Sequence, residues 1–176
     1  MTNKIVSQPS PAAAFITDRR WAWFWLIARL AVSYPWLTSG WSKINNPAWV
    51  GDKAGTAMTG FAANALKLTG GAHPAVPSWY GWFLENAVLP NAAVWGYAVA
   101  FGELLVGLGL FFGVLTGLAA FFGGFMNLNY LLSGSVSINP ILLIASIGIA
   151  LAWRIAGWWG GDRWILPVLD RIRLRR

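Results

Sequence analysis

The sequence predicts an all-α integral membrane protein, a four-helix bundle with short amphipathic helices on its extracytoplasmic side. Hydrophobic residues make up 57% of the 176 residues and charged residues 11%, whereas about a quarter of an ordinary soluble domain is charged. Residues 91–132 hold a single charge, Glu103, and are about twice as long as the roughly 20 residues that one helix needs to cross a bilayer. Thirteen tryptophans fit the same class, because indole rings favour membrane interfaces.

Four apolar runs predict four membrane-spanning helices. Their ranges are 21–41, 91–112, 114–132 and 138–158. Basic residues precede the first run and close the chain, so the positive-inside rule predicts that both termini are cytoplasmic. Residues 19–160 then form the transmembrane domain, residues 1–18 a flexible cytoplasmic N-terminus, and residues 161–176 a basic cytoplasmic tail. Asp18 is expected to cap the helix that follows it.

The loop 42–90 lies outside in this topology and is predicted to contain two short amphipathic helices. The first covers about 56–68, where apolar residues recur at helical spacing. The second covers about 78–89, with Trp79 and Trp82 on one side. Both helices are expected to lie on the outer membrane surface and to roof the bundle.

The composition restricts the cofactors and partners. The chain has no cysteine, which excludes disulfides, thiolate-held iron–sulfur clusters and c-type haem. Its single histidine, His73, cannot supply both axial ligands of a transmembrane b-type haem, and no metal-ligand motif is evident. An electron-transfer role would therefore need a bound small molecule such as quinone, or a partner subunit. The basic ends fit anionic membrane lipids better than nucleic acid.

One face of the first span carries every charge of that segment. Arg29, Ser33, Trp36, Gly40 and Lys43 follow spacings of three and four residues and therefore share one side of a helix. Charged side chains are costly against lipid tails. This face is therefore predicted to point into the bundle.

Arg29 and Glu103 are predicted to form a salt bridge. Arg29 lies about eight residues from the cytoplasmic start of its span and Glu103 about nine residues from the cytoplasmic end of its own, so both lie roughly 12–14 Å from the inner boundary. The pair either fixes helix register only, since buried ion pairs are often neutral in net stability, or borders a cavity for a ligand headgroup or a proton. In the second interpretation Arg29 and Glu103 are the catalytic residues.

A second polar group is expected nearer the outer face. Amide and ammonium donors beside aromatic walls would suit a quinone carbonyl and ring, or a small anion. The candidate substrate- or quinone-binding residues are Lys43, Trp36, Trp41, Asn127, Asn129 and Tyr130. The alternative is ordinary anchoring of these side chains at the membrane interface.

Several motifs together resemble the DoxX/DoxD family of four-helix membrane proteins. They include SGWSK at 39–43, FGELLVGLGL at 101–110 and MNLNYLL at 126–132. The long first loop with WYGWFLENAVLPN resembles the DoxD branch, which includes the membrane subunit of thiosulfate:quinone oxidoreductase. Carried over by position, the family pattern falls on Arg29, Gly40, Lys43, Glu103, Asn127 and Asn129.

The resemblance implies a multi-pass protein of a bacterial or archaeal plasma membrane that serves a quinone-linked oxidoreductase. Thiosulfate would approach from outside, attracted by Lys43 with Lys53 or Lys67 as additional positive charges, and quinone would come from the bilayer. The alternative is a non-catalytic accessory subunit that anchors a larger respiratory or photosynthetic complex. Either function implies a second subunit or a larger membrane complex as partner. A small-solute channel or carrier is a third hypothesis, suggested only by the buried charges.

Overall fold

The computed structural model describes residues 10–173, with side chains through residue 171. Within these residues all regular structure is helical and no β-strand occurs, so the predicted all-α class is confirmed. In chain order the helices are α1 (Pro11–Thr17), η1 (Arg19–Trp21), α2 (Ala22–Ile44), α3 (Thr56–Leu66), α4 (Ser78–Phe83), η2 (Leu84–Val88), η3 (Leu89–Asn91), α5 (Ala92–Phe112), α6 (Thr116–Leu132), α7 (Asn139–Leu151), α8 (Trp153–Ala156) and α9 (Asp162–Arg173).

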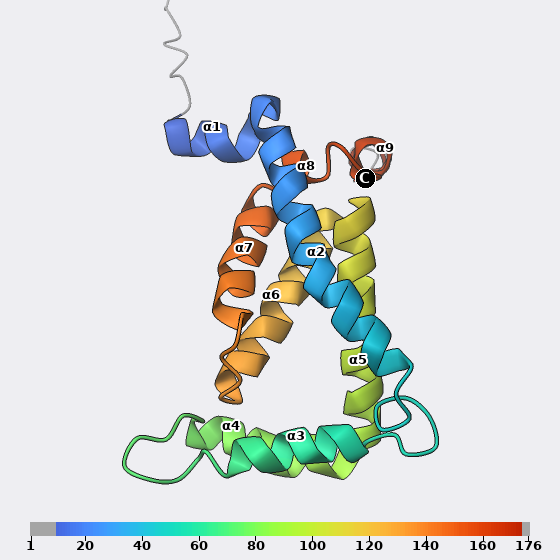
Figure 1. Cartoon of the computed structure of the whole chain (residues 1–176). Helices are drawn as coiled ribbons and strands as arrows, with labels where there is room; N and C mark the ends of the chain where they lie inside the picture. The colour runs from blue at the N-terminus through green and yellow to red at the C-terminus, as the bar shows by residue number, and fades with distance from the viewer. Residues whose placement is uncertain (1–9, 174–176) are drawn as a thin grey trace, which may run out of the picture.

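The four longest helices, α2, α5, α6 and α7, stand between two layers of surface helices (Figure 1). α2 packs along α5, and α6 packs along α7. α3 and α4 lie across one end of these helices, while α1 and α9 lie across the other end, so both ends of the described chain are on the same side. The two helix pairs stand apart at the end that α3 and α4 cover.

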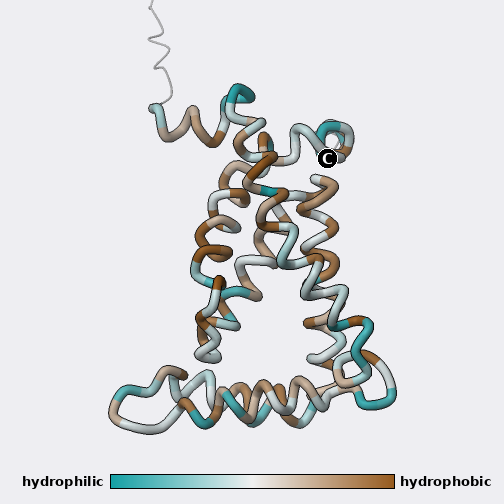
Figure 2. Tube along the Cα trace, in the orientation of Figure 1, coloured by the Kyte–Doolittle hydropathy of each residue, from teal (hydrophilic) through white to brown (hydrophobic). Residues whose placement is uncertain are grey.

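The outer surface of the upright helices is apolar. Figure 2 shows hydrophobic residues along these helices and hydrophilic residues mainly in the loops and surface layers. Leu105 on α5, Phe121 on α6 and Ile144 on α7 are 66%, 59% and 73% exposed, and a soluble protein rarely exposes a broad apolar surface of this kind. One continuous helical stretch, Ser78–Phe112, is long and apolar enough to cross a membrane, and Asn139–Leu151 is apolar but shorter. The arrangement with four spans stays a prediction.

Two glycines allow α2 and α5 to approach closely. A Cβ atom at Gly40 would stand 2.5 Å from the backbone nitrogen of Leu104, and a Cβ atom at Gly107 would stand 2.7 Å from the backbone nitrogen of Leu37. The two antiparallel helices therefore meet backbone to backbone, as small residues permit in membrane helices. The predicted inward face of the first span is confirmed, because all of its residues except half-buried Lys43 are buried.

α3 and α4 form the predicted roof, with a hydrophobic core of their own. The residues buried in it are Met58, Ala62, Ala65, Val76, Tyr80, Leu84 and Val88. Trp79 and Trp82 share the outer side of α4 and are 62% and 67% exposed. The roof therefore buries one side of each short helix, and α4 presents aromatic rings on its other side.

The turn between α5 and α6 is held by the segment that follows α8. Gly113 ends α5 in the left-handed region, at φ +64°, and its carbonyl accepts a hydrogen bond from the backbone N–H of Asp162 at 2.7 Å. The Asp162 carboxylate accepts from the backbone N–H groups of Leu115 at 2.6 Å and Thr116 at 2.8 Å. Backbone groups at helix ends need such partners, so the predicted tail begins as a buried structural part of the bundle.

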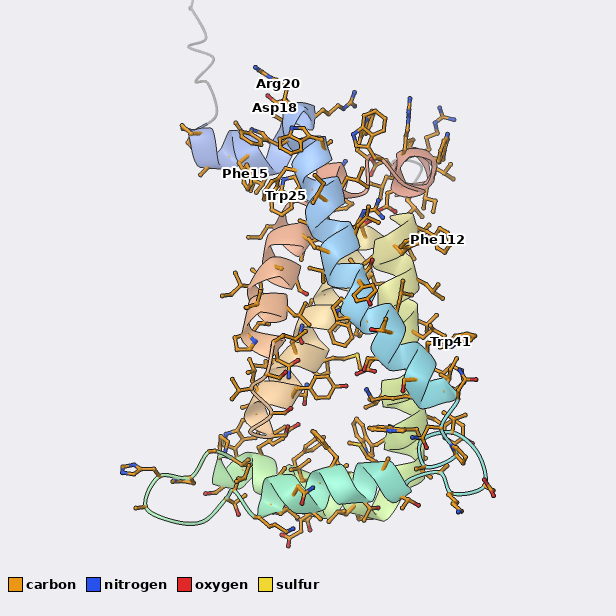
Figure 3. The ribbon with its side chains drawn as sticks, in the orientation of Figure 1. Phe15, Asp18, Arg20, Trp25, Trp41 and Phe112 are labelled. Carbon is orange, nitrogen blue, oxygen red and sulfur yellow. The ribbon has the colours of Figure 1, made fainter. Side chains whose placement is uncertain are left out.

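Part of the predicted flexible N-terminus is helical. Ser10 caps α1 by accepting a hydrogen bond from the backbone of Ala13 at 3.3 Å. The Trp25 indole N–H donates to the Phe15 carbonyl at 2.9 Å, and the two rings contact each other (Figure 3). Asp18 caps η1 as predicted, and its hydrogen bond from the backbone N–H of Arg20 lowers the pKa of that carboxyl. Residues 1–9 lie outside the described residues.

The predicted fourth helix is divided in two. α7 ends at Leu151, and α8 begins at Trp153 after a residue that leaves helical geometry, Ala152. Trp153 packs against α6 at Gly117, where a Cβ atom would stand 2.8 Å from the Trp153 Cβ. α8 therefore contacts α6 as well as α2.

Candidate functional site

A buried acid, an ammonium group and a phenol meet between α2, α5 and α6. Lys43 Nζ lies 2.6 Å from Glu103 Oε2, and the Tyr130 hydroxyl donates to Glu103 Oε1 at 2.5 Å. Lys43 also donates to Ser39 Oγ at 2.7 Å, one turn earlier on α2. Glu103 is 2% exposed, and both of its carboxylate oxygens are paired, as a buried charge requires. We call these four residues the Glu103 cluster.

Helix packing and aromatic contacts position the cluster. The close approach of α2 to α5 at Gly40 brings the last turn of α2 next to Glu103. The Tyr130 ring stacks on Trp36, with ring centroids 6.5 Å apart, and meets the edge of Phe61 from the roof at 6.1 Å. Aromatic contacts on two sides restrict the Tyr130 ring and therefore the direction of its hydroxyl.

An apolar groove runs between α5 and α6 and reaches the Glu103 cluster at Tyr130. Its volume is about 880 Å³, and α5, α6 and the roof form its walls. Lining residues on the long helices include Ala98, Gly102, Leu105, Leu118, Phe122, Phe125 and Met126. Leu105 and Phe125 are 66% and 55% exposed, so the groove is open toward the surface that faces lipid in a membrane protein.

The polar side chains that line the groove gather at its roof end. They are Tyr80, Asn129 and Tyr130. The Tyr80 hydroxyl lies 3.1 Å from the Asn129 carbonyl oxygen and 3.2 Å from its Oδ1 atom, while Asn129 Nδ2 donates to the Phe125 carbonyl at 2.8 Å. The groove therefore has a long apolar part and one polar end.

The predicted salt bridge between Arg29 and Glu103 is wrong. Arg29 is 1% exposed, but its guanidinium donates to the backbone carbonyls of Leu110 and Phe111 at the C-terminal end of α5. Arg29 Nη1 lies 2.8 Å from the Phe111 carbonyl oxygen. A helix C-terminus carries partial negative charge and unpaired carbonyls, so Arg29 Nη1 finds acceptors there without a carboxylate, while its buried Nε makes no hydrogen bond to the described residues. Its observed contacts are those of a structural residue.

The estimate of equal depth failed because α2 extends past the end of α5. In the observed register Gly40 lies beside Leu104, while Arg29 contacts Gly113. Gly113 is ten residues beyond Glu103, or roughly 15 Å along the helix. α2 also contacts α8 and η1, and apolar run lengths alone do not reveal these contacts.

Four of the six predicted binding residues, Lys43 among them, do not line the groove. Trp41 is 64% exposed on the outer side of α2 (Figure 3). Asn127 is fully buried, and its amide atoms make no hydrogen bond to the residues that the structure describes. Trp36 packs behind Tyr130 and does not line the groove. Asn129 and Tyr130 do line it, and Lys43 reaches it through Glu103.

Sequence reasoning missed Ser39, Phe61 and Tyr80. Ser39 lies one turn before Lys43, so its role follows once the lysine is known to turn inward. Phe61 and Tyr80 come from the roof helices, and no pattern in their own segments shows which helix they touch. Within residues 10–173, no group of three or more His, Cys, Asp or Glu side chains is arranged to hold a metal ion.

The cluster runs from a partly exposed lysine to the groove. The side chain of Lys43 is 18% exposed and that of Glu103 is 2% exposed, so the ammonium group is the outermost ionisable member. Tyr130 is the member that faces the groove. A chain of ammonium, carboxylate and phenol can pass a proton between its ends, because each member exchanges a proton with a neighbour in direct hydrogen-bond contact.

Comparison with known proteins identifies the family. The DoxX family model matches residues 24–133, which is more than half of the chain and includes the Glu103 cluster and every wall of the groove. Neither a curated protein nor a solved structure matches the chain. The protein therefore belongs to the DoxX family of membrane proteins.

Proposed function

We propose that the protein binds a quinone in the groove between α5 and α6 and is the quinone-facing membrane subunit of an oxidoreductase. The observation that carries this proposal is the direct junction of an apolar groove with the Glu103 cluster at Tyr130. A quinone joins an apolar isoprenoid chain to a ring whose carbonyls take up protons on reduction. The volume of about 880 Å³ falls in the range of small-molecule sites.

In this proposal the quinone ring lies beside Tyr130 and Asn129, and the isoprenoid chain follows the groove toward the α5–α6 turn. Reduction to the quinol takes up two electrons and two protons. Tyr130 gives a proton to a ring carbonyl and recovers one through Glu103 and Lys43 from the solvent side. The route uses contacts of 2.5 and 2.6 Å, which suit direct proton transfer.

The electrons come from the donor. The DoxD resemblance suggests thiosulfate, of which two ions lose two electrons as they join through a new sulfur–sulfur bond, at this protein or on a partner subunit. Lys43 is paired with Glu103, so the exposed residues Lys53 and Lys67 supply the positive charge that draws the anion toward the roof.

The same proposal sets the orientation in the membrane. α2, α5, α6 and the α7–α8 pair cross the bilayer of a bacterial or archaeal plasma membrane, with both termini in the cytoplasm and the roof outside. The support is the apolar outer surface of these helices and the placement of α1 and α9 at one end (Figure 1).

Quinone binding tests the proposal directly. Purified protein is titrated with a soluble quinone analogue, and quenching of tryptophan fluorescence reports the dissociation constant. Tyr130→Phe is expected to weaken binding about five- to tenfold, because one hydrogen bond contributes roughly 1 kcal/mol. Tyr34→Phe is the matched control, since Tyr34 is 71% exposed and outside the groove. Equal affinity in the wild type and Tyr130→Phe, or no binding by the wild type, would overturn the proposal.

The second candidate function is a non-catalytic accessory subunit. The apolar groove walls favour it, because walls from both α5 and α6 would also seat a helix of a larger complex. The two candidates differ in competition: a partner helix in the groove would exclude the quinone analogue. Two results together would support the accessory function. The protein would co-purify with redox subunits, and Glu103→Gln would lower the yield of assembled complex without changing the turnover of the complex that does assemble.

A further inference from the structure

Two arginines from opposite ends of the chain converge on one tryptophan. The Arg19 guanidinium carbon lies 3.8 Å from the centre of the Trp158 ring system, and that of Arg163 lies 5.4 Å from it. Arg19 belongs to η1 and Arg163 to α9, so the site exists only in the folded chain. The ring attracts each cation through its face, but it does not neutralise two positive charges.

The acidic side chains described at this end already have other partners. Asp18 pairs with Arg20 at 3.0 Å, and Asp170 pairs with Arg154 at 3.4 Å. Asp162 is 1% exposed and accepts hydrogen bonds from the start of α6. Within residues 10–171, Arg19 and Arg163 therefore have no carboxylate partner, and both are exposed.

The surface beside these arginines is apolar. On α9, Trp164, Val168 and Leu169 are 70%, 55% and 46% exposed. α9 and α1 lie flat across the same end of the bundle (Figure 1). A helix that lies flat with exposed apolar side chains next to arginines is typical of the headgroup layer of a membrane. A free anion would gain nothing from the exposed apolar side chains of α9, whereas a lipid would contact these side chains with its acyl chains and the arginines with its headgroup.

We propose that Arg19, Arg163 and Trp158 form a binding site for the phosphate of an anionic phospholipid, with the acyl chains against the exposed apolar side of α9. The fork of N–H groups on a guanidinium matches phosphate oxygens through paired hydrogen bonds. Both guanidinium carbons lie within 5.4 Å of one ring centre, and the proposal places one phosphate in contact with both groups. The site is independent of the quinone groove, which lies between α5 and α6.

The test uses the full-length protein in detergent, with native mass spectrometry to measure the affinity of phosphatidylglycerol and phosphatidylcholine. The double variant R19Q/R163Q is expected to lose about tenfold or more in affinity for phosphatidylglycerol, with little change for phosphatidylcholine. R154Q is the matched control, because Arg154 lies at the same end but is paired with Asp170. R19K/R163K keeps the charges but loses the forked donors, so an intermediate affinity is expected.

Two results would overturn the proposal. One is an unchanged phosphatidylglycerol affinity in a folded R19Q/R163Q protein whose quinone-analogue affinity equals that of the wild type. The other is displacement of the bound lipid by millimolar inorganic phosphate, which would make the site one for a free anion.

Discussion

Glu103 holds its charge in the bundle interior between two unlike partners. Lys43 supplies an opposite charge at 2.6 Å, and Tyr130 supplies a neutral donor at 2.5 Å. A buried ion pair adds little net stability, but removal of one partner leaves the other charge buried and unpaired. The cluster therefore affects folding even in the absence of any ligand.

A double-mutant cycle on Lys43 and Glu103 measures this dependence. Lys43→Met is expected to destabilise the protein by roughly 3 kcal/mol, because it strands the carboxylate. Adding Glu103→Leu should recover most of that loss, since no unpaired charge then remains. Thermal unfolding in detergent provides the measurement. If the loss of stability in the double variant equals the sum of the losses in the two single variants, the Lys43–Glu103 pairing is contradicted.

The contrasting cycle uses Arg29 and Glu103. Because Arg29 binds carbonyls at the end of α5 and does not touch Glu103, the coupling between Arg29→Gln and Glu103→Gln is expected to stay below about 0.5 kcal/mol. A coupling energy as large as that between Lys43 and Glu103 would contradict the structure and support the Arg29–Glu103 salt bridge predicted from the sequence.

At this scale the sequence predicts burial better than it predicts partners. The spacing of Arg29, Trp36, Gly40 and Lys43 was sufficient to place them on one inward face. Which lysine or arginine meets Glu103 depends on the axial register of α2 against α5. That register is fixed by backbone contacts at Gly40 and by the turns of α2 beyond the end of α5, and neither follows from hydropathy.

Among the elements, α2 and α5 meet backbone to backbone at two glycines. Gly107→Ala is expected to cost about 1–3 kcal/mol, because the new methyl group would meet the backbone of Leu37 at 2.7 Å. Gly102→Ala on the same helix is the matched control. Its methyl group would meet only the flexible end of Met126, at 3.4 Å, so the better helix propensity of alanine should leave stability equal or raised. Equal melting shifts for both variants would contradict the proposed close approach.

The link between α9 and the start of α6 gives a second prediction at this scale. Asp162→Ala removes two hydrogen bonds to backbone N–H groups and is expected to cost roughly 2–3 kcal/mol. Asp170→Ala on the same helix breaks a pair whose side chains are about half exposed and should cost less than about 1 kcal/mol. Chemical or thermal unfolding of both variants is the measurement. A larger loss of stability in Asp170→Ala than in Asp162→Ala would show that the contact of Asp162 with the start of α6 is dispensable.

Element boundaries follow from local sequence where a local signal exists. The predicted spans stop at residue 112 and resume at 114, on either side of Gly113, and the glycine- and proline-containing stretch 70–77 lies between α3 and α4. The division of α7 from α8 at Ala152 has no such signal, because residues 149–153 are apolar and include neither glycine nor proline. The break instead accompanies the packing of Trp153 against Gly117 on α6, a tertiary contact that the local sequence does not show.

For the whole molecule, the separation of the two helix pairs beneath the roof creates the groove. Apolar runs predicted the long helices and the two roof helices, since hydrocarbon thickness and helical spacing leave clear patterns in a sequence. The groove could not be predicted in the same way, because its walls come from α5, α6 and the roof together. The sequence placed Asn129 and Tyr130 near the outer face but gave no sign of the space in front of them.

The proposed topology is testable because the chain contains no cysteine. Single cysteines at Asn64 on α3 and Thr17 on α1, both exposed, are treated with a membrane-impermeant maleimide in intact cells and in inverted vesicles. Asn64→Cys is expected to react only from outside and Thr17→Cys only from the cytoplasmic side. Reaction of both from the same side would exclude an orientation with the roof outside and both termini inside.

The most direct measurement of the central claim is quinone-analogue affinity after the groove is narrowed from its wall. Ala98 lines the groove, and the nearby residue Val94 is 68% exposed and does not line it. The account predicts that Ala98→Phe weakens binding at least about tenfold by filling space, while Val94→Phe leaves the affinity unchanged. Equal affinities in Ala98→Phe, Val94→Phe and the wild type would show that the quinone does not bind between α5 and α6.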